Sequence, residues 1–245
     1  MTINRNFYQI NDSITAQDLA KSLGTTLLSG PTDIKINDIA AFDQAAPGSL
    51  SFQASPGAFD NYAPAGAIII TNAACASLVD GSNACLIVDH PRLGFAKALN
   101  FLLGDHFDKN TTDKGGVSAS ATIAASANIH PSATVMSGAV IGPDTSIGPN
   151  VVLYSGVEIG RNCQIGANTV LSYALIGDHV EIGAGCIIGA AGFGFEMTEK
   201  GAVKLQHLGL VRIDDSVSIG SGCAIDRGSL GDTFIRLASR SVIIL

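Results

Sequence analysis

The sequence predicts a mainly β protein, with a small α/β domain over residues 1–106, a linker over 107–116 and a parallel β-helix over 117–245. Three observations support this fold class. Aliphatic residues recur at every sixth position after Gly116, and the first 106 residues lack this period. The 245 residues include 28 glycines, yet only 6% are aromatic. A core of many small aliphatic layers accounts for such a composition.

The residues before the linker alternate helix and strand patterns. Thr15 can cap a short helix, with Asp18 in the capping-box position and Gly24 at its end. Pro91 begins a second helix, which continues over 92–103. The apolar segments between the helices are strand candidates, namely Ile34–Ile39, Ser49–Phe52, Gly66–Thr71 and Cys85–Asp89. This order of elements predicts one α/β domain.

The six-residue repeat begins directly after the linker. Ten aliphatic residues follow one another at this spacing, namely Val117, Ile123, Ile129, Val135, Ile141, Ile147, Leu153, Ile159, Ile165 and Leu171. One residue is then dropped, and the series resumes at Ile176, Ile182 and Ile188 and returns at Ile213, Ile219 and Ile225. Glycine often follows the aliphatic residue, and a small or β-branched residue often stands four positions after it. Three cysteines, at 163, 186 and 223, share this last slot, and we interpret them as buried core residues.

This period is typical of hexapeptide repeats, which form a parallel β-helix with a triangular cross-section. Each hexad supplies one short strand and a turn, and three hexads make a coil of about 18 residues. The aliphatic side chain points inward and stacks on its equivalent in the next coil, about 4.8 Å away. We expect the following glycine to supply unusual backbone angles at the corner. Proteins with this repeat wind left-handed, which breaks the usual rule for crossover connections.

One long segment, residues 189–212, interrupts the repeat. We call it the insertion. It lacks any six-residue rhythm, so it has to leave the prism. Loops that leave a rigid scaffold often carry binding residues, although a purely decorative loop is the alternative.

Charge, cysteine usage and hydropathy argue against several classes of protein. The net charge of −7 disfavours a nucleic-acid surface. The polar start, Met1–Ser13, lacks the apolar core of a secretory signal. The most apolar window, 63–79, is interrupted by Thr71 and Asn72 and is too short for a stable membrane helix. Five cysteines without a CxxC pair argue against a disulfide framework or a zinc site. We therefore expect a cytoplasmic protein without a bound metal or cofactor.

Three motifs in the second half, read with the first domain, resemble one family. GFGFE at 192–196 is followed by KLQHLGLV at 204–211 and IDRGSLGDT at 225–233. In the first half, GAIIIT and LIVDHPRLGFAKAL are similar to the same family's uridine-binding domain. Together they resemble the UDP-3-O-acylglucosamine N-acyltransferases of lipid A biosynthesis, over nearly the whole chain.

The resemblance implies an enzyme that transfers a 3-hydroxyacyl chain from acyl carrier protein to the 2-amine of UDP-3-O-acylglucosamine. It also implies a homotrimer, with active sites between neighbouring β-helices, and no cofactor. A β-helix with aliphatic residues on its outer edges can bury that surface against symmetry-related copies of the same chain.

Amide formation from a thioester needs a general base and N–H donors for the oxyanion. The resemblance places the family's catalytic histidine beyond Leu245, so we expect no catalytic residue among the five histidines. His130 and His179 read as solvated turn residues. His207 stands where the family more often has glutamine. The segment 234–245 departs from the family pattern, with Arg236 in place of a glycine, which suggests a truncated or frame-shifted product with an incomplete β-helix.

Two groups of residues are candidates for substrate binding. For the uracil, Phe52 matches the family's stacking phenylalanine, Ser55 stands where the family has asparagine, and Phe59 replaces its tyrosine only if one residue is inserted. Ordinary core packing is the alternative for both rings. In the second half, the candidates are Gly192, Phe193, Gly194, Phe195, Lys204, Gln206, His207, Asp226 and Arg227. The two glycines let main-chain N–H groups approach a phosphate or sugar, the two phenylalanines can pack on acyl chain or sugar, and Lys204 can pair with a phosphate. A local ion pair between Asp226 and Arg227 remains the alternative for that dipeptide.

Two other functions compete with the transferase. The chain could be a non-catalytic remnant that binds a UDP-sugar but lacks the catalytic histidine. A different hexapeptide enzyme, such as an O-acyltransferase or a γ-class carbonic anhydrase, would need another arrangement. The O-acyltransferases of this pathway lack a uridine domain in front, and the anhydrase needs three histidine ligands to zinc, which the spacing of His130, His179 and His207 does not match.

Overall fold

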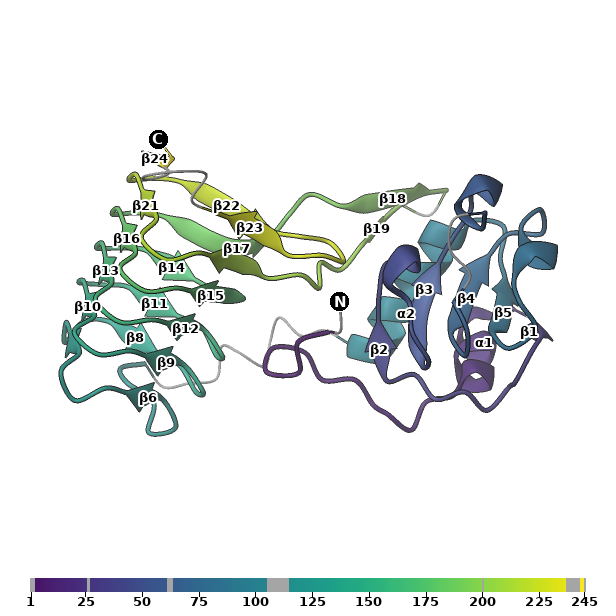
Figure 1. Cartoon of the computed structure of the whole chain (residues 1–245), viewed down its shortest axis with the longest axis horizontal. Helices are drawn as coiled ribbons and strands as arrows, with labels where there is room; N and C mark the ends of the chain where they lie inside the picture. The colour runs from purple at the N-terminus through teal and green to yellow at the C-terminus, as the bar shows by residue number, and fades with distance from the viewer. Residues whose placement is uncertain are drawn as a thin grey trace. The chain divides into compact units, whose positions relative to one another are not determined.

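The computed structural model describes residues 3–25, 27–60, 64–104, 115–199, 201–236 and 243–244. Contacts group the chain into two compact units (Figure 1). The N-terminal unit comprises Met1–Asp105 together with Phe193–Gln206, and the β-helix unit comprises His106–Gly192 with His207–Leu245. The middle of the insertion therefore belongs to the N-terminal unit. Most of the expected linker lies outside the described residues, and the expected domain limits stay a prediction.

The N-terminal unit is built on a five-stranded sheet in the order β1-β5-β4-β3-β2 (Figure 1). Its strands are β1 (Leu27–Ser29), β2 (Asp38–Ile39), β3 (Ser49–Phe52), β4 (Ile68–Thr71) and β5 (Ala84–Ile87). Strands β2 to β5 run parallel, and β1 pairs antiparallel with β5. The central strand β4 is buried along its whole length: three isoleucines are followed by Thr71, whose hydroxyl donates to the Gln53 carbonyl at 2.6 Å.

In the described part of this unit, two helices and three short 3-10 helices accompany the sheet. Helix α1 (Ala16–Leu23) has the expected capping box, in which Asp18 N donates to Thr15 Oγ1 and Thr15 N donates to the Asp18 carboxylate. Its end at Gly24, in the left-handed conformation, is also confirmed. Helix α2 (Pro91–Leu103) begins at the expected proline and packs on β3 and β4. The 3-10 helices are η1 (Phe42–Gln44), η2 (Pro56–Ala58) and η3 (Ala76–Leu78).

The expected strand over 34–39 is shorter in the structure. Only Asp38 and Ile39 pair with the sheet, as β2. The residues before them hydrogen-bond to the segment around Thr15 instead, since Ile36 N donates to the Ile14 carbonyl and Ala16 N donates to the Ile34 carbonyl. Strand β1, which the sequence pattern did not predict, closes the opposite edge of the sheet.

The β-helix unit is a left-handed parallel β-helix of hexapeptide repeats whose strands form three flat faces (Figure 1). The first face contains β7 (Asn128–Ile129), β10 (Ser146–Ile147), β13 (Gln164–Ile165), β16 (Glu181–Ile182), β21 (Ser218–Ile219) and β24 (Ile243–Ile244). The second contains β8 (Thr134–Val135), β11 (Val152–Leu153), β14 (Val170–Leu171), β17 (Ile187–Ala191) and β22 (Ala224–Arg227). The third contains β6 (Thr122–Ile123), β9 (Val140–Ile141), β12 (Glu158–Ile159), β15 (Ala174–Ile176), β20 (Val211–Ile213) and β23 (Thr233–Ile235).

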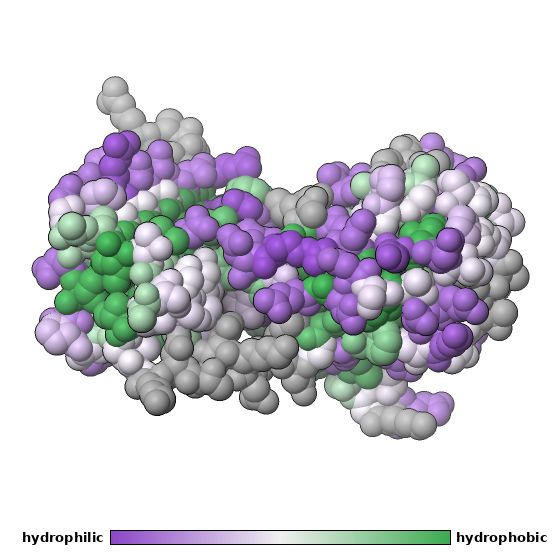
Figure 2. Space-filling model, turned by 90° about the horizontal axis from the view of Figure 1, so that it is seen from below, coloured by the Kyte–Doolittle hydropathy of each residue, from purple (hydrophilic) through white to green (hydrophobic). Residues whose placement is uncertain are grey.

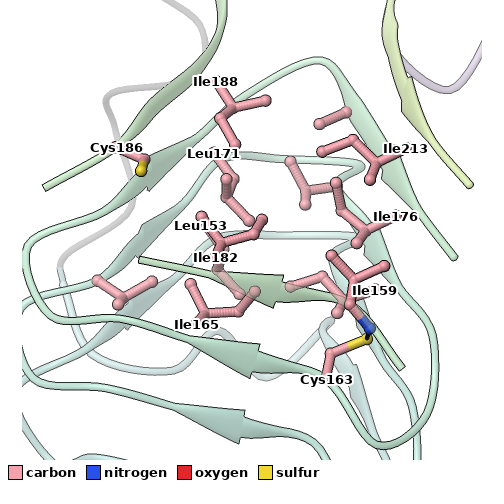
Figure 3. Packing of buried hydrophobic residues seen from close by; sticks show 14 of the residues in the cluster. Leu153, Ile159, Cys163, Ile165, Leu171, Ile176, Ile182, Cys186, Ile188 and Ile213 are labelled. Carbon is pink, nitrogen blue, oxygen red and sulfur yellow. Dashed lines mark hydrogen bonds between the residues drawn. The ribbon is translucent and has the colours of Figure 1, made fainter. Parts of the chain in front are cut away.

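The register of these strands confirms the six-residue repeat. Leu153 lies beside Leu171, 18 residues further along the chain, and Leu171 lies beside Ile188. Figure 3 shows these three side chains stacked in one column inside the prism. Across the insertion the register is kept, because Ile188 pairs with Ile225 and Ile176 with Ile213. The aliphatic columns form one continuous buried core.

The glycine after the aliphatic residue has a different role from the one expected. Gly142 and Gly166, which occupy this slot, do not have a positive φ. A side chain there would collide with the next coil, since a Cβ at Gly166 would lie 2.5 Å from Ala184 N. Positive φ values fall two positions later, at residues such as Asn168 (φ 58°) and Gly185 (φ 72°). The corner glycine therefore permits close approach between coils, and the left-handed turn residue follows it.

Two of the three cysteines in the repeating slot are fully buried, as expected. Cys163 and Cys186 each direct the thiol to a glycine carbonyl of the next coil, at 3.1 Å from Gly177 O and Gly220 O. Burial raises the pKa of both thiols. Cys223, nearer the end of the series, is half-buried. All three act as small core residues.

The two ends of the β-helix differ from its middle. Val117, in the first turn, is 52% exposed. Seen from the side on which β6 lies, this unit presents a hydrophobic patch (Figure 2). At the other end, the expected loss of the repeat after Thr233 is wrong for the first residues. Thr233–Ile235 form β23, in which Ile235 aligns with Ile213 and packs on the core. Of segment 234–245, residues 237–242 and 245 lie outside the described residues.

Candidate functional site

The irregular positions of the repeat lie on neighbouring strands of the second face. Strands β14, β17 and β22 are adjacent, with Leu171, Ile188 and Ile225 in register. One residue is dropped after Leu171, the insertion begins after Ile188, and the Asp-Arg-Gly motif follows Ile225. Strand β17 has an irregular register between Ile188 and Ala190, where Gly189 has a φ of 83°. This corner is where the chain leaves the prism.

Gly192 lies next to two polar side chains at this corner. A Cβ at Gly192 would lie 3.2 Å from His207 Nε2 and 3.6 Å from Asp226 Oδ2. His207 is 9% exposed, whereas Asp226 is exposed. The structure thus brings three of the sequence candidates, Gly192, His207 and Asp226, around one point. An imidazole and a carboxylate at this spacing can hydrogen-bond the hydroxyl or amine groups of a sugar.

The Arg227 side chain hydrogen-bonds to main-chain carbonyls and does not pair with Asp226. Its Nε donates to the His207 carbonyl at 3.0 Å, and its Nη1 donates to the Gly189 carbonyl at 2.8 Å. Its Cζ lies 4.0 Å from the centroid of the Tyr173 ring. Ion pairs among the described residues join Arg5 to Asp12, Arg92 to Glu196, Arg161 to Asp178 and Arg212 to Asp232. The alternative of a local Asp226–Arg227 ion pair is therefore wrong.

The middle of the insertion forms a hairpin in the N-terminal unit. Strand β18 (Phe195–Thr198) pairs antiparallel with β19 (Gly201–Lys204) and packs on α2. Glu196 forms an ion pair of 2.9 Å with Arg92, and Gln206 Nε2 donates to Asn100 Oδ1 at 3.0 Å. Gln206 thus helps to fasten the hairpin to this unit.

The opposite side of the hairpin is open to solvent. Phe193 is 94% exposed and Phe195 39%, with ring centroids 4.9 Å apart. Met197 is 80% exposed on the same strand, and Lys204, opposite Phe195, is also exposed. Gly194 accepts a hydrogen bond from Leu205 N through its carbonyl. Two aromatic rings and a methionine without cover are suited to an apolar ligand.

The two rings expected to hold a uracil have different ring partners. Phe52 is half-buried and packs on Phe95, with centroids 4.9 Å apart. Phe59 packs edge-on against Phe42 at 4.8 Å. Ser55 is exposed and precedes η2. The described contacts leave each ring partly accessible and do not include a pairing of Phe52 with Phe59, so the sandwich stays a prediction.

Two of the other histidines lie in turns of the β-helix unit. His130 is exposed, and its Nδ1 lies 2.8 Å from Ser132 Oγ. His179 is exposed in a left-handed turn with a φ of 56°. Both are turn residues, as predicted. His90 precedes α2, and His106 lies outside the described residues. In the described part of the chain, no cluster of three or more potential metal ligands occurs.

Two residues of this region escaped the sequence analysis. Tyr173 lies under Arg227 with a φ of 46°, and burial raises the pKa of its hydroxyl. Asp232 has a side chain only 3% exposed, which accepts from Leu210 N at 2.8 Å and pairs with Arg212. The spacing of five residues, and not six, between Leu171 and Ile176 could have drawn attention to Tyr173. No feature of the repeat indicated Asp232, because its partners, Leu210 and Arg212, lie in another coil.

The fold defines the class of hexapeptide-repeat proteins. Residues 119–154 and 138–173 match the model of the bacterial transferase hexapeptide (six repeats). Residues 33–101 match the model described as UDP-3-O-(3-hydroxymyristoyl) glucosamine N-acyltransferase, LpxD. The chain belongs to the LpxD family. No helix in the described ranges has the length and apolar character needed to cross a membrane.

Relatives with known names match most of the chain. UDP-3-O-acylglucosamine N-acyltransferase of Pseudomonas aeruginosa (strain UCBPP-PA14) is 40% identical over 235 residues, 91% of this chain and 63% of that protein. The protein of the same name from Coxiella burnetii (strain Dugway 5J108-111) is 37% identical over 232 residues, 89% of this chain and 64% of that protein. The chain thus spans less than two thirds of their length. Among solved structures, GDP-perosamine N-acetyltransferase from Caulobacter crescentus is 16% identical, with a TM-score of 0.36 over 72% of this chain and 66% of that chain.

Proposed function

We propose that the protein transfers a 3-hydroxyacyl chain from acyl carrier protein to the 2-amine of UDP-3-O-acylglucosamine, a step of lipid A biosynthesis. One observation carries the proposal. Relatives named UDP-3-O-acylglucosamine N-acyltransferase match both units together, over 91% of the chain. The activity is proposed for the whole enzyme, because the chain covers 63% of that relative.

The geometry of the insertion supports this chemistry. His207 and Asp226, both close to Gly192, suit the polar groups of a sugar. Phe193 and Phe195 offer exposed rings for an acyl chain, and Lys204 offers a cation for a phosphate. We give His207 a substrate-binding role, because its Nε2 and the Asp226 carboxylate both lie close to Gly192. The reaction calls for no cofactor, because the thioester already activates the acyl group.

The enzymatic test is acyl transfer by the whole enzyme. With 3-hydroxyacyl carrier protein and UDP-3-O-acylglucosamine, mass spectrometry should detect a diacylated UDP-sugar. Binding of the UDP-sugar without any product would favour the non-catalytic alternative. Absence of both binding and product would contradict the proposal.

For the uridine site, we expect the substitution Phe52→Ala to weaken UDP-sugar binding by about tenfold, since stacking of a base on an aromatic ring contributes roughly 1–3 kcal/mol. Isothermal titration with UDP measures the affinity. Phe101→Ala, at a phenylalanine 47% exposed on α2, is the matched control. An unchanged affinity in Phe52→Ala would contradict the assignment.

We also propose a homotrimer, supported by the outward side chains of the second face. They form a column with no charge, namely Thr134, Val152, Val170, Ile187 and Ala224. The first face carries polar residues at the same positions, from Asn128 to Ser218. A symmetric assembly of the prism would bury the uncharged column.

Ile187→Lys should therefore convert the trimer to monomers, because a lysine at this 49% exposed position would be buried without a partner in the interface. Light scattering after size-exclusion chromatography measures the mass. Val140→Lys, on the third face at 37% exposure, should remain trimeric. A monomeric parent chain would contradict the proposal.

We place the enzyme in the cytoplasm and expect neither nucleic acid nor membrane insertion among its partners. Cys75, Cys85, Cys163, Cys186 and Cys223 are all free thiols. Free cysteines are usual in a reducing compartment. The net charge of −7 disfavours binding to nucleic acid.

A further inference from the structure

Three irregularities of the repeat involve the same corner of the β-helix unit. Strands β14, β17 and β22 carry Leu171, Ile188 and Ile225 in register. Each aliphatic residue is followed by a break in the pattern: the dropped residue with Tyr173, the start of the insertion at Gly189, and the Asp-Arg pair. Because the three breaks lie on adjacent strands, we expect them to have a common structural role.

Arg227 connects all three of these breaks. Its Nε donates to the His207 carbonyl at 3.0 Å and its Nη1 to the Gly189 carbonyl at 2.8 Å. The guanidinium carbon lies 4.0 Å from the centroid of the Tyr173 ring. The side chain thus has one face on an aromatic ring and two N–H groups on main-chain carbonyls.

These two carbonyls belong to the places where the insertion departs and where it returns. Gly189 is the first residue of the insertion, and His207 precedes the strand that rejoins the prism. They are separated by 18 positions in sequence, yet both reach one guanidinium. Closing a loop of this length costs conformational entropy, which a rigid bridge between its ends offsets.

We infer that Arg227 is a positioning residue, which holds the two ends of the insertion together above Tyr173 and does not bind a substrate phosphate. It acts through Gly192 and His207, whose placement beside Asp226 depends on these ends. The inference rests on the proposed function only for its effect on substrate binding. The bridge itself is a property of the chain alone.

The chemistry of the guanidinium group explains why position 227 is an arginine. A guanidinium is planar and presents several N–H donors in a fixed fork, so it can reach two carbonyls and stack on a ring at once. The ammonium of lysine lacks this fork. To chelate a phosphate with Nε and Nη1, Arg227 would have to release both carbonyls. Lys204, exposed on the hairpin, is a cation of the insertion that is open to a phosphate.

Hydrogen exchange of the substrate-free chain tests the bridge. Arg227→Ala and Arg227→Lys should each raise amide exchange over residues 189–192 and 207–210 by about tenfold, the change that corresponds to losing roughly 1.4 kcal/mol of local stability. Tyr173→Phe keeps the ring and should exchange like the parent chain. Arg236→Ala is the matched control, since Arg236 also lies over a ring, that of Phe234 at 4.3 Å.

A kinetic measurement separates positioning from general stability. In the whole enzyme, Arg227→Lys should raise KM for UDP-3-O-acylglucosamine several-fold while the melting temperature stays near that of the parent, and Arg236→Ala should change neither. Unchanged exchange in both Arg227 variants, with weaker UDP-sugar binding, would overturn the inference and make Arg227 a ligand. If Arg227→Ala does not fold, the hydrogen exchange of Arg227→Lys alone tests the inference. Faster exchange in the Arg227 variants, together with a whole enzyme that transfers no acyl group, would retain the bridge and reject the proposed function.

Discussion

Replacing Leu171 with alanine is expected to lower the free energy of unfolding by about 3 kcal/mol. Leu171 is fully buried in the column that contains Leu153 and Ile188, and it touches the coils on both sides. Truncation removes apolar contacts and leaves a cavity, because the flanking strands are fixed by their hydrogen bonds and cannot collapse into the space. Urea denaturation followed by circular dichroism measures the change.

The matched control for this substitution occupies the same column. Val117 bridges to Val135 at the start of the β-helix, but it is 52% exposed. Val117→Ala should change the free energy of unfolding by less than about 0.5 kcal/mol, as is usual for surface positions. Equal losses at Leu171 and Val117 would contradict the view that burial between two coils, and not the repeat slot itself, determines the contribution of an aliphatic residue.

The sequence predicted the β-helix well because its period is set by local geometry. A hexad places one aliphatic side chain inward whatever its neighbours are, so Ile147, Ile165 and Ile182 could be assigned to the core by counting. The role of the corner glycine could not be found in this way. Gly166 is required by the backbone of the next coil, and a single hexad contains no information about that distance.

The candidate site shows the same division between local and distant causes. The insertion and its motifs were visible in the sequence, and the structure gathers Gly192, His207 and Asp226 around one point. The partners of Arg227 were not visible, because the carbonyls of His207 and Gly189 are distant from it in sequence. The attachment of the hairpin to α2 also depends on a distant pair, Arg92 with Glu196.

The substitution Gly166→Ala tests the role of the corner glycine, and we expect it to destabilise the chain by about 3 kcal/mol. The new Cβ would lie 2.5 Å from Ala184 N and 2.7 Å from Gly183 C, so the two coils would have to separate. Their separation would stretch the hydrogen bond from Gly166 N to the Ile182 carbonyl, which is 2.8 Å long in the parent chain. Chemical denaturation gives the loss of stability, and a fall in β-sheet ellipticity would report the separation.

Gly185 provides the opposite case within the next coil. Its φ of 72° is left-handed, but a Cβ there would meet no atom within 4 Å. Gly185→Asn should therefore cost no more than about 1 kcal/mol, because asparagine tolerates this conformation and already occupies the same slot at Asn150, Asn162 and Asn168. If Gly185→Asn proved the more damaging of the two, backbone angle and not contact between coils would explain the glycines of this repeat. The greater loss in Gly166→Ala would instead mean that the spacing of adjacent coils selects glycine at the corners of the prism.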